Sequence, residues 1–273
     1  MWDEITQRKY RRDGLRYASD TTDAEWAVIE PFLPSAIARG RPRTTALRAV
    51  VDALFYIGQT GCQWRMLPKD FPPFTTVQRY FYPWRDNGLW QSINQALVML
   101  ARQIEARAAS PSAGIIDSQS VKTTEAGGPR GYDAGKKVKG RKRHILTDTI
   151  GLLLGAIVHP ADVQDRDGAP MLMAAIRTAW PGLQHLFADA AYAGDKLETA
   201  LAGLGTWSLD IVRRADDAKG FVLLPRRWVV ERTLAWLNRN RRLAKDFEAT
   251  IESARAWIMI DSVKLLARRL ARA

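Results

Sequence analysis

The sequence predicts an α/β protein in two parts, a small all-α module followed by a mixed sheet flanked by helices. Apolar residues recur at helical spacing in the first third of the chain, and short apolar runs bounded by glycine, proline or acid dominate after it. Between the two parts, residues 109–114 (ASPSAG) have the composition of a linker. Strands mixed with covering helices are typical of a layered α/β domain.

The all-α module is expected over residues 21–108. TTDAEWAVIEPFL predicts a short helix that ends at Pro34, and the stretch from residue 40 predicts a second helix that stops at Gly61. PPFTTVQRYFYPWRDNG predicts a third helix, capped by Thr75 or Thr76, and LWQSINQALVMLARQIEARA predicts a long amphipathic fourth. Four helices with short turns form a compact unit, with a helix-turn-helix-like arrangement as one option.

The second part, residues 115–273, is expected to begin with a strand that closes at Asp117. Residues 140–161 predict two strands around a turn, and HLFADAAY predicts another strand, which ends at Asp189. Helices are predicted from APMLMAAIRTAW and DKLETALAGLG. A long helix is predicted to begin near Arg226 and to carry Glu231. The glycine-rich, basic stretch after the first strand is expected to be a mobile loop.

The charge favours a polyanionic partner. Lys and Arg outnumber Asp and Glu by 41 to 29, which gives a formal net charge of +12, and residues 1–20 form a polar, basic arm. Nucleic acid is favoured over an anionic membrane surface, because the sequence contains no run of 18 apolar residues and no apolar stretch of a secretory signal. A cytoplasmic location is therefore expected.

A metal ion in this chain would need oxygen ligands. One cysteine excludes a disulfide framework and a cysteine-rich zinc site, and the three histidines are too far apart for an HExxH motif. Asp117, Asp189 and Glu231 are the candidate ligands. The ordinary alternatives are a turn residue, a strand-end cap and an exposed helix residue. If the three carboxylates converge, they require a cation, and oxygen ligands select Mg²⁺ or Mn²⁺. Two such ions can promote phosphodiester displacement.

Several segments together resemble bacterial insertion-sequence transposases of the Asp-Asp-Glu (DDE) class, and the sequence is similar to the insertion-sequence-five family. The resemblance runs from about Ala18 to the C-terminal helix and rests on DAEWAVIEPFLP, on GRPRTTALRAVVDALFYIGQTGCQWRMLPKDFPP, on IIDSQSVKTTEAGGPRGYDAGKKVKGRKRHILTDT, on HPADVQDRDGAP and on RRWVVERTLAWLNRNRRLAKDFE. It implies a ribonuclease-H-like fold with the first Asp on the first strand, the second after the fourth strand and the Glu on a later helix. These are Asp117, Asp189 and Glu231.

The resemblance also implies the reaction and the partners. A DDE transposase binds the terminal inverted repeats of its element in double-stranded DNA, cleaves at the element's ends to free a 3′-hydroxyl, and joins that hydroxyl to target DNA by transesterification. Two Mg²⁺ or Mn²⁺ ions are expected in the active complex. Because the ends are paired, we expect at least a homodimer on DNA. The location implied is a bacterial cytoplasm, with association to the nucleoid when DNA is bound.

The sequence departs from the family pattern in two places. Related transposases carry Tyr-x2-Arg-x3-Glu-x6-Lys, and Arg227 and Glu231 fit this spacing, whereas Leu224 and Asn238 replace the Tyr and the Lys. Pro83 is expected to kink or end the third helix. A decayed, catalytically inactive DNA-binding relative is therefore the alternative to an active enzyme. A different ribonuclease-H-like nuclease, such as a resolvase, is disfavoured by the separate helical module.

DNA contacts are expected from clustered basic residues. Residues 136–143 hold six Lys or Arg, with a solubilising loop as the alternative, and RGRPRT resembles an arm that reaches a minor groove, with an interhelical loop as the alternative. Asp162, Asp165 and Asp167 are rival metal ligands, but their tight spacing is typical of a turn and a helix cap. The expected DNA-contact residues are Arg41, Arg43, Arg79, Lys122, Lys136, Lys137, Lys139, Arg141, Lys142, Arg143, Arg227, Asn238, Arg241 and Arg242.

Overall fold

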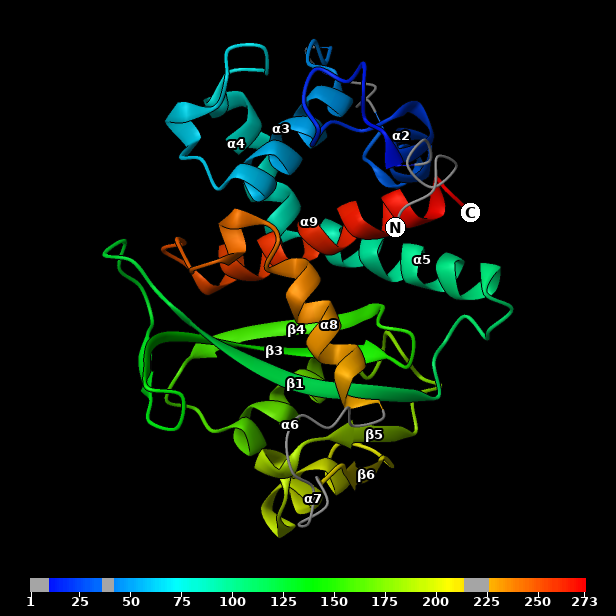
Figure 1. Ribbon diagram of the computed structural model, residues 1–273, viewed down its shortest axis with the longest axis vertical. Helices are drawn as coiled ribbons and strands as arrows, with labels where there is room; N and C mark the ends of the chain where they lie inside the picture. Colours follow the sequence, from blue (N-terminus) through cyan, green and yellow to red (C-terminus); the bar gives the residue numbers. More distant parts are fainter. Residues whose placement is uncertain (1–9, 36–41, 214–225) are drawn as a thin grey trace.

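A computed structural model of the chain describes residues 10–35, 42–213 and 226–273. Two residues singled out in the sequence, Arg41 and Leu224, lie outside these ranges. Within them the chain forms a helical region above a curled, mixed sheet, and further helices cover the sheet (Figure 1). The mixed α/β class and the preceding helical region agree with the sequence prediction.

The four predicted helices of the N-terminal region are all present. They are α2 (Asp23–Ile29), which continues into the short η1 (Glu30–Phe32), then α3 (Leu47–Thr60), α4 (Phe74–Asp86) and α5 (Leu89–Ile104). Thr22 and Glu25 form a capping box at the start of α2. Gly61 ends α3 in the left-handed conformation, at φ 70°.

Three details of α4 and its surroundings differ from the prediction. The N-cap of α4 is Pro73, with no side-chain cap, because Thr75 and Thr76 already lie inside the first turn. Pro83 does not end the helix, which continues to Asp86, and the carbonyl of Pro83 accepts a hydrogen bond from Asn87 N at 3.0 Å. Burial of the neighbouring turn in the core keeps this segment helical. Residues 61–73 separate α3 from α4, a longer connection than the short turns predicted between the helices.

The sheet places β1 at its centre. Its strands are β1 (Ala113–Lys122), β2 (Gly131–Asp133), β3 (Val138–Asp148), β4 (Leu153–Pro160), β5 (His185–Ala188) and β6 (Ser208–Ile211). On one side, β1 pairs antiparallel with β3, which pairs antiparallel with β2 and β4. On the other side, β1 pairs parallel with β5, and β5 pairs parallel with β6. The sheet therefore changes from antiparallel to parallel at β1.

Strand β1 is longer than predicted. It does not close at Asp117 but continues to Lys122, because its second half pairs with β3 as far as Lys122 opposite Gly140. The strand also begins at Ala113, inside the stretch predicted to be a linker. For the same reason, the basic stretch from residue 131 onward contains β2 and the start of β3 rather than only a loop.

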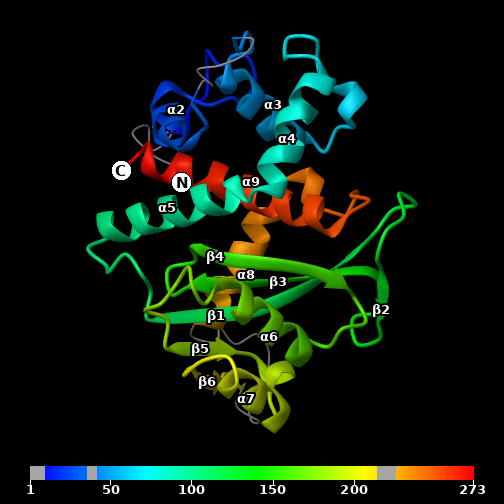
Figure 2. The same cartoon turned by 180° about the vertical axis from the view of Figure 1, so that it is seen from behind.

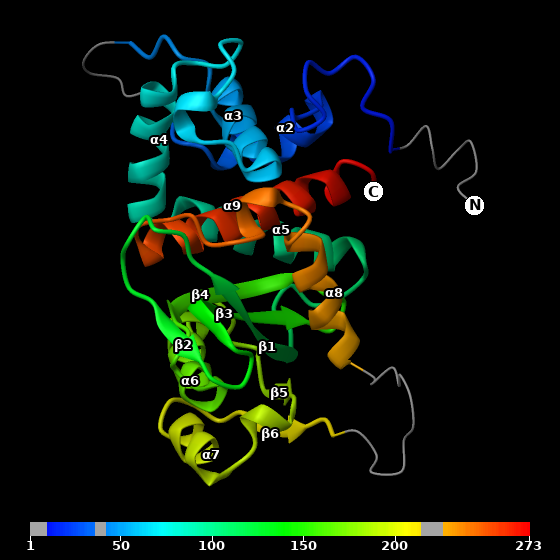
Figure 3. The ribbon, with the colours of Figure 1, turned by 60° about the vertical axis from the view of Figure 1, so that its left-hand side comes forward.

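Helices cover both faces of the sheet. α8 (Arg227–Leu237) packs against β1 and β3 on one face, and α6 (Asp165–Ile176) packs against β3 and β4 on the other, with α7 (Asp195–Ala202) beside α6 (Figures 2 and 3). The last helix, α9 (Ile251–Leu270), lies with α5 against β4. In the described ranges, no helix combines the length and the apolar character needed to cross a bilayer.

The helical region and the sheet share one apolar core. Val50 and Leu54 of α3, Ile116 of β1 and Trp257 of α9 belong to the same buried cluster. A buried ion pair reinforces this junction, because Arg102 of α5 binds Asp148 at the end of β3. The second carboxylate oxygen of Asp148 accepts hydrogen bonds from the backbone of the β3–β4 turn. One side chain therefore fixes both the turn and α5.

Replacing Arg102 by alanine is expected to lower the free energy of unfolding by about 3–5 kcal/mol, because Asp148 would remain as an unpaired buried charge. Urea unfolding measures this change. Arg177→Ala, at the exposed end of α6, is the matched control and should stay within about 0.5 kcal/mol of the parent. Equal effects of the two substitutions would contradict a stabilising role for the buried pair.

Candidate active site

Asp117 lies on the central strand, half-buried between its neighbours. The backbone N–H of Ser118 donates to its Oδ1 at 2.7 Å. Burial raises the pKa of the Asp117 carboxyl to about 6, and the negative charge of Asp189 adds to this shift, while the hydrogen bond from Ser118 and the charges of Lys136 and Arg227 oppose it. The ionised form of Asp117 therefore needs more positive charge than the surrounding residues supply.

Strand register brings Asp189 beside Asp117. In the parallel pairing of β1 with β5, Ile115 lies opposite Phe187, so the same register continued by two residues sets Asp117 opposite Asp189. Adjacent strands are about 5 Å apart. Asp189 follows β5 directly, as predicted, and it also caps the short η3 (Ala190–Tyr192) by accepting from Ala191 N at 2.9 Å. Its cap role and its place beside Asp117 are compatible.

Arg227 connects Glu231 to the strand acids. Both residues lie on α8, one helical turn apart, and Arg227 Nε is 3.0 Å from Glu231 Oε1. The same guanidinium places Nη2 3.5 Å from Asp189 Oδ2. Arg227 thus pairs with two of the three predicted acids, and its charge also lowers the pKa of the third, Asp117.

The donor set suits a hard divalent cation, although it is not closed around one point. Asp117, Asp189 and Glu231 offer carboxylate oxygens only, the ligands that Mg²⁺ and Mn²⁺ prefer. Over the described ranges, no group of three or more His, Cys, Asp or Glu side chains is positioned to hold a metal ion. A cation does lie between two of the acids, namely the Arg227 guanidinium. Asp189 and Glu231 are therefore close enough to bind the same positively charged group.

A second polar cluster lies on the opposite face of β1, where Ser118 points toward α6. Ser118 Oγ donates to Asp165 Oδ1 at 2.9 Å, and Lys142 Nζ lies 2.8 Å from the same oxygen. Lys136 Nζ donates to the carbonyl and the hydroxyl of Ser118, both at 3.0 Å. The rival acid Asp165 is thus paired with lysine. Asp165 is the first residue of α6, which begins four residues before the helix predicted from Ala169, and the N-cap is Gln164 without a side-chain cap.

Two residues that the sequence did not single out complete this cluster. Asp133 accepts hydrogen bonds from Ser120 and from the backbone of Lys136. Burial alone would raise the pKa of Asp133, but these hydrogen bonds and the charge of Lys142 have the larger effect and lower it to about 2. Tyr192, fully buried after Asp189, has a pKa raised well above its usual value by burial and by nearby acids. Tyr192 is the last residue of the LFADAAY segment, and an aromatic residue so close to Asp189 could have identified it from the sequence.

The buried histidines are structural. His144 Nδ1 and His159 Nε2 are 2.7 Å apart, and His159 Nδ1 is 2.8 Å from the carbonyl oxygen of Pro160, which fixes His159 Nε2 as the acceptor. Burial lowers the pKa of His144 to about 3. His144 is therefore neutral at physiological pH and lies on β3, as the sequence predicted.

The expected DNA-contact residues divide into exposed and buried sets. The exposed or partly exposed set comprises Arg43, Arg79, Lys122, Lys136, Lys137, Lys139, Arg227, Asn238 and Arg241, and the buried set comprises Arg141, Lys142, Arg143 and Arg242. Arg141 pairs with Asp246 at 3.2 Å and binds backbone carbonyls of residues 248–250, and Arg143 donates to the carbonyl of Leu243 at 2.6 Å. Burial argues against phosphate contact by these four residues.

The prediction of a long helix carrying Glu231 was wrong in its length. α8 ends at Leu237, Asn238 is its C-cap, and Arg241 and Arg242 lie in the separate η4 (Arg241–Leu243). Arg242 pairs with Glu248 at 2.6 Å, so it is held in the interior instead of following the helix.

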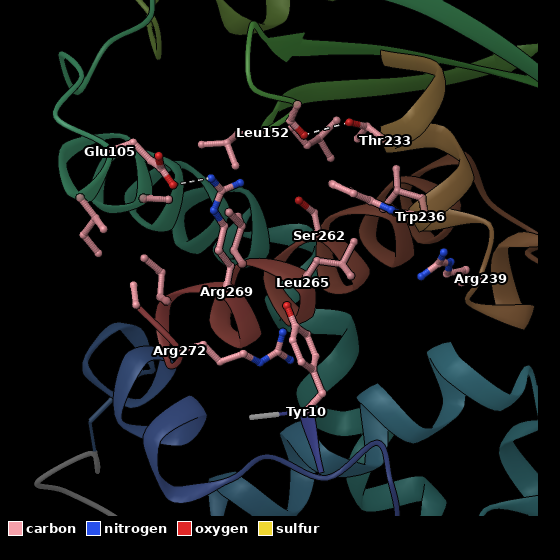
Figure 4. A pocket seen from close by; sticks show the side chains of 18 residues that line it. Tyr10, Glu105, Leu152, Thr233, Trp236, Arg239, Ser262, Leu265, Arg269 and Arg272 are labelled. Atoms are coloured by element: carbon pink, nitrogen blue, oxygen red, sulfur yellow. Dashed lines mark hydrogen bonds and ion pairs between the residues drawn. The ribbon is translucent and has the colours of Figure 1, made fainter. Parts of the chain in front are cut away.

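A cavity of about 700 Å³ lies apart from the acids, between α5, the C-terminal part of α8 and α9. Figure 4 shows Trp236 and Leu265 on its walls and Arg239, Arg269 and Arg272 around it. None of the three acids lines this cavity. The acids instead lie where β1, β5 and the first turns of α8 meet.

Two family models match parts of this chain. Residues 108–263 match the family described as transposase DDE domain, and residues 21–94 match one described as putative transposase of the IS4/5 family. The chain is 31% identical over 93 residues to an uncharacterised protein, y4sN, of Sinorhizobium fredii, an alignment that covers 34% of this chain and 67% of that protein.

A second relative carries a descriptive name. The chain is 34% identical over 128 residues to a putative transposase for insertion sequence element IS402 of Burkholderia cepacia, covering 44% of this chain and 60% of the relative. The chain thus spans less than two thirds of this relative's length. No solved structure matches the chain.

Asp117 should give the protein a distinctive pH dependence. Because its pKa is raised from 3.8 to about 6 on folding, its contribution to stability is complete below about pH 4 and is lost as the pH rises toward 6. In Asp117→Asn, the fall in the free energy of unfolding between pH 4 and pH 7 should be smaller than in the parent by about 1–3 kcal/mol. Denaturant unfolding at pH 4 to 7 measures the difference, with Asp167→Asn as the control. Equal pH dependence in the parent and Asp117→Asn would contradict the environment described for Asp117.

Proposed function

Since the chain belongs to the transposase DDE domain family of the IS4/5 group, we propose that it binds the terminal inverted repeats of an insertion sequence and catalyses strand cleavage and strand transfer into target DNA. The observation that carries this proposal is that Asp189 and Glu231 both pair with Arg227, while the charges of Asp189 and Arg227 also act on Asp117. We further propose that the protein acts as a homodimer or larger assembly on paired DNA ends, in a bacterial cytoplasm.

The topology supports a ribonuclease-H-like catalytic domain over residues 115–273. A central first strand has an antiparallel hairpin on one side and two parallel strands on the other. Asp117 lies on that first strand and Glu231 on a later helix. Asp189 follows β5, the fourth strand when the three-residue β2 is set aside. This is the order of acids that the family resemblance implies.

The chemistry assigned to the acids follows from their charge. Asp117, Asp189 and Glu231 would hold two Mg²⁺ or Mn²⁺ ions, which when bound activate the attacking oxygen and stabilise the leaving oxygen of an in-line phosphodiester displacement. The rigid central strand and the parallel register fix the two aspartates relative to each other, while α8 presents Glu231 from the facing layer. The side chain of Glu231 is 51% exposed, so it is accessible to a substrate from solvent.

Exposed cations supply the phosphate contacts in this proposal. Lys137 and Lys139 lie on the β2–β3 hairpin, and Lys122 lies at the end of β1, next to this hairpin in the sheet. Arg79 lies exposed on α4 of the helical region, residues 21–108, to which we assign recognition of the terminal repeats. The buried Arg141, Lys142, Arg143 and Arg242 are excluded from the contact set.

The second candidate is a DNA-binding relative without catalysis. Asn238, in place of the family lysine, is the observation that favours it, because an amide cannot supply a charge to phosphate. Pro83 no longer supports this candidate, since α4 accommodates it. Mutation of the acids separates the two candidates.

Asp117→Asn, Asp189→Asn and Glu231→Gln should each reduce Mg²⁺-dependent nicking by at least about a hundredfold, because each removes a charged oxygen ligand. Nicking is measured on a duplex taken from the ends of the element that encodes the chain. Asp167→Asn, on the first turn of α6, is the control and should cleave at the parental rate. All four variants should bind this duplex. Parental cleavage by Asp117→Asn would sink the catalytic assignment.

Lys139→Gln should weaken DNA binding without changing sequence preference, and it should lower the slope of log K against log salt by about 0.9 for the lost phosphate contact. Fluorescence anisotropy across a salt series measures both quantities. Arg177→Gln makes the same change in charge on α6, behind the sheet, and should leave the slope unchanged. A slope in Lys139→Gln equal to that of the parent would remove Lys139 from the proposed contact set.

A further inference from the structure

Arg227 pairs with two of the three acids that are proposed to hold metal. Its Nε lies 3.0 Å from Glu231 Oε1 and its Nη2 lies 3.5 Å from Asp189 Oδ2, so the guanidinium uses an oxygen of each of two acids. A divalent ion shared by Asp189 and Glu231 would draw on the same carboxylates. The guanidinium and such an ion cannot both keep these contacts, because like charges at this separation repel strongly.

The charge balance at the site favours replacement of Arg227. Two carboxylates pair with one guanidinium, whose charge also acts on Asp117, and the ammonium of Lys136 is bound mainly to the carbonyl and the hydroxyl of Ser118. A single positive charge leaves the acids under-neutralised, whereas divalent ions would neutralise them. Arg227 is thus a partial counter-ion for the site.

The side chain of Arg227 is able to leave. It is the first residue of α8 and is 36% exposed, so rotation of its side-chain torsions can carry the guanidinium to solvent without unwinding the helix. Ion pairs at this exposure are weak because water screens them. A phosphodiester offers the guanidinium a partner of matching shape, with two oxygens for its two-pronged donor set.

We propose that Arg227 is an exchangeable counter-ion that pairs with Asp189 and Glu231 while DNA is absent and transfers to a DNA phosphate when DNA binds, thereby vacating the site for metal. This inference rests on the proposed function, since it requires the three acids to bind metal. Arg227 acts as a positioning residue. Metal and DNA must then increase each other's affinity by the same factor.

Metal binding without DNA gives the first test. Mn²⁺ affinity is measured by electron paramagnetic resonance of the free ion. Arg227→Gln should bind Mn²⁺ about three- to tenfold more tightly than the parent, because the competing charge is gone. Arg227→Lys keeps a charge and should stay close to the parent. Arg177→Gln, with the same change in net charge on the far face, should equal the parent. Thermal unfolding followed by circular dichroism confirms that each variant is folded.

Addition of random-sequence duplex DNA gives the second test. The parent should gain Mn²⁺ affinity when DNA is present, and Arg227→Gln should gain at least about threefold less, because it has no counter-ion to transfer. Arg177→Gln should gain as much as the parent. An equal gain in Arg227→Gln and the parent would overturn the exchange.

Failure of the inference and failure of the proposed function give different results. Mn²⁺ binding that is unchanged in Asp117→Asn would show that the three acids are not the metal site, and the proposed function would fall with the inference. Binding that is lost in Asp117→Asn but unchanged or weaker in Arg227→Gln would overturn the exchange alone. Tighter binding in both Arg227→Gln and Arg177→Gln would reveal a general effect of net charge, and this result also overturns the exchange.

Discussion

Repulsion between two neighbouring carboxylates organises the site. The parallel register between β1 and β5 determines the relative position of Asp117 and Asp189, so backbone pairing alone sets them side by side. Two adjacent carboxylates remain ionised only where a cation compensates them. Arg227 on α8 and Lys136 on the β2–β3 hairpin both direct positive charge toward this point. By packing across β1, α8 therefore brings the positive charge of Arg227 close to the two carboxylates that the sheet sets side by side.

The need to neutralise buried charge also explains why basic residues lie in the interior of the sheet. Arg141 and Arg143 point to one face of β3 and Lys142 and His144 to the other, because successive strand residues alternate. One face meets Asp246 and the carbonyls of the C-terminal segment, and the other meets Asp133 and Asp165. A strand rich in cations can occupy the core because each face supplies oxygen. The basic composition of the chain thus overstates the charge available at its surface.

Local patterns predicted most elements, since periodicity and caps act over a few residues. The sequence predicted the end of α3 at Gly61, the turn after β3 and the position of Asp189 directly after a strand. The full length of β1 was not, because its second half depends on pairing with β3, whose partner residues lie 18 to 26 positions further along the chain. Burial of Arg141 and Arg143 depends on residues about a hundred positions away, and composition carries no trace of it. The link from Arg227 to Glu231 follows from helical spacing, whereas the link from Arg227 to Asp189 required the packed structure.

The continuous core between the helical region and the sheet has a geometric consequence. Arg102 and Asp148 join α5 to the end of β3, and α5 packs with α9 against β4. In the proposed function, helices that read bases and acids that cut a strand would be held at a constant separation by this packing. The number of base pairs between the recognised sequence and the broken phosphate would then be set by side-chain packing, and a change in that packing would move the cut.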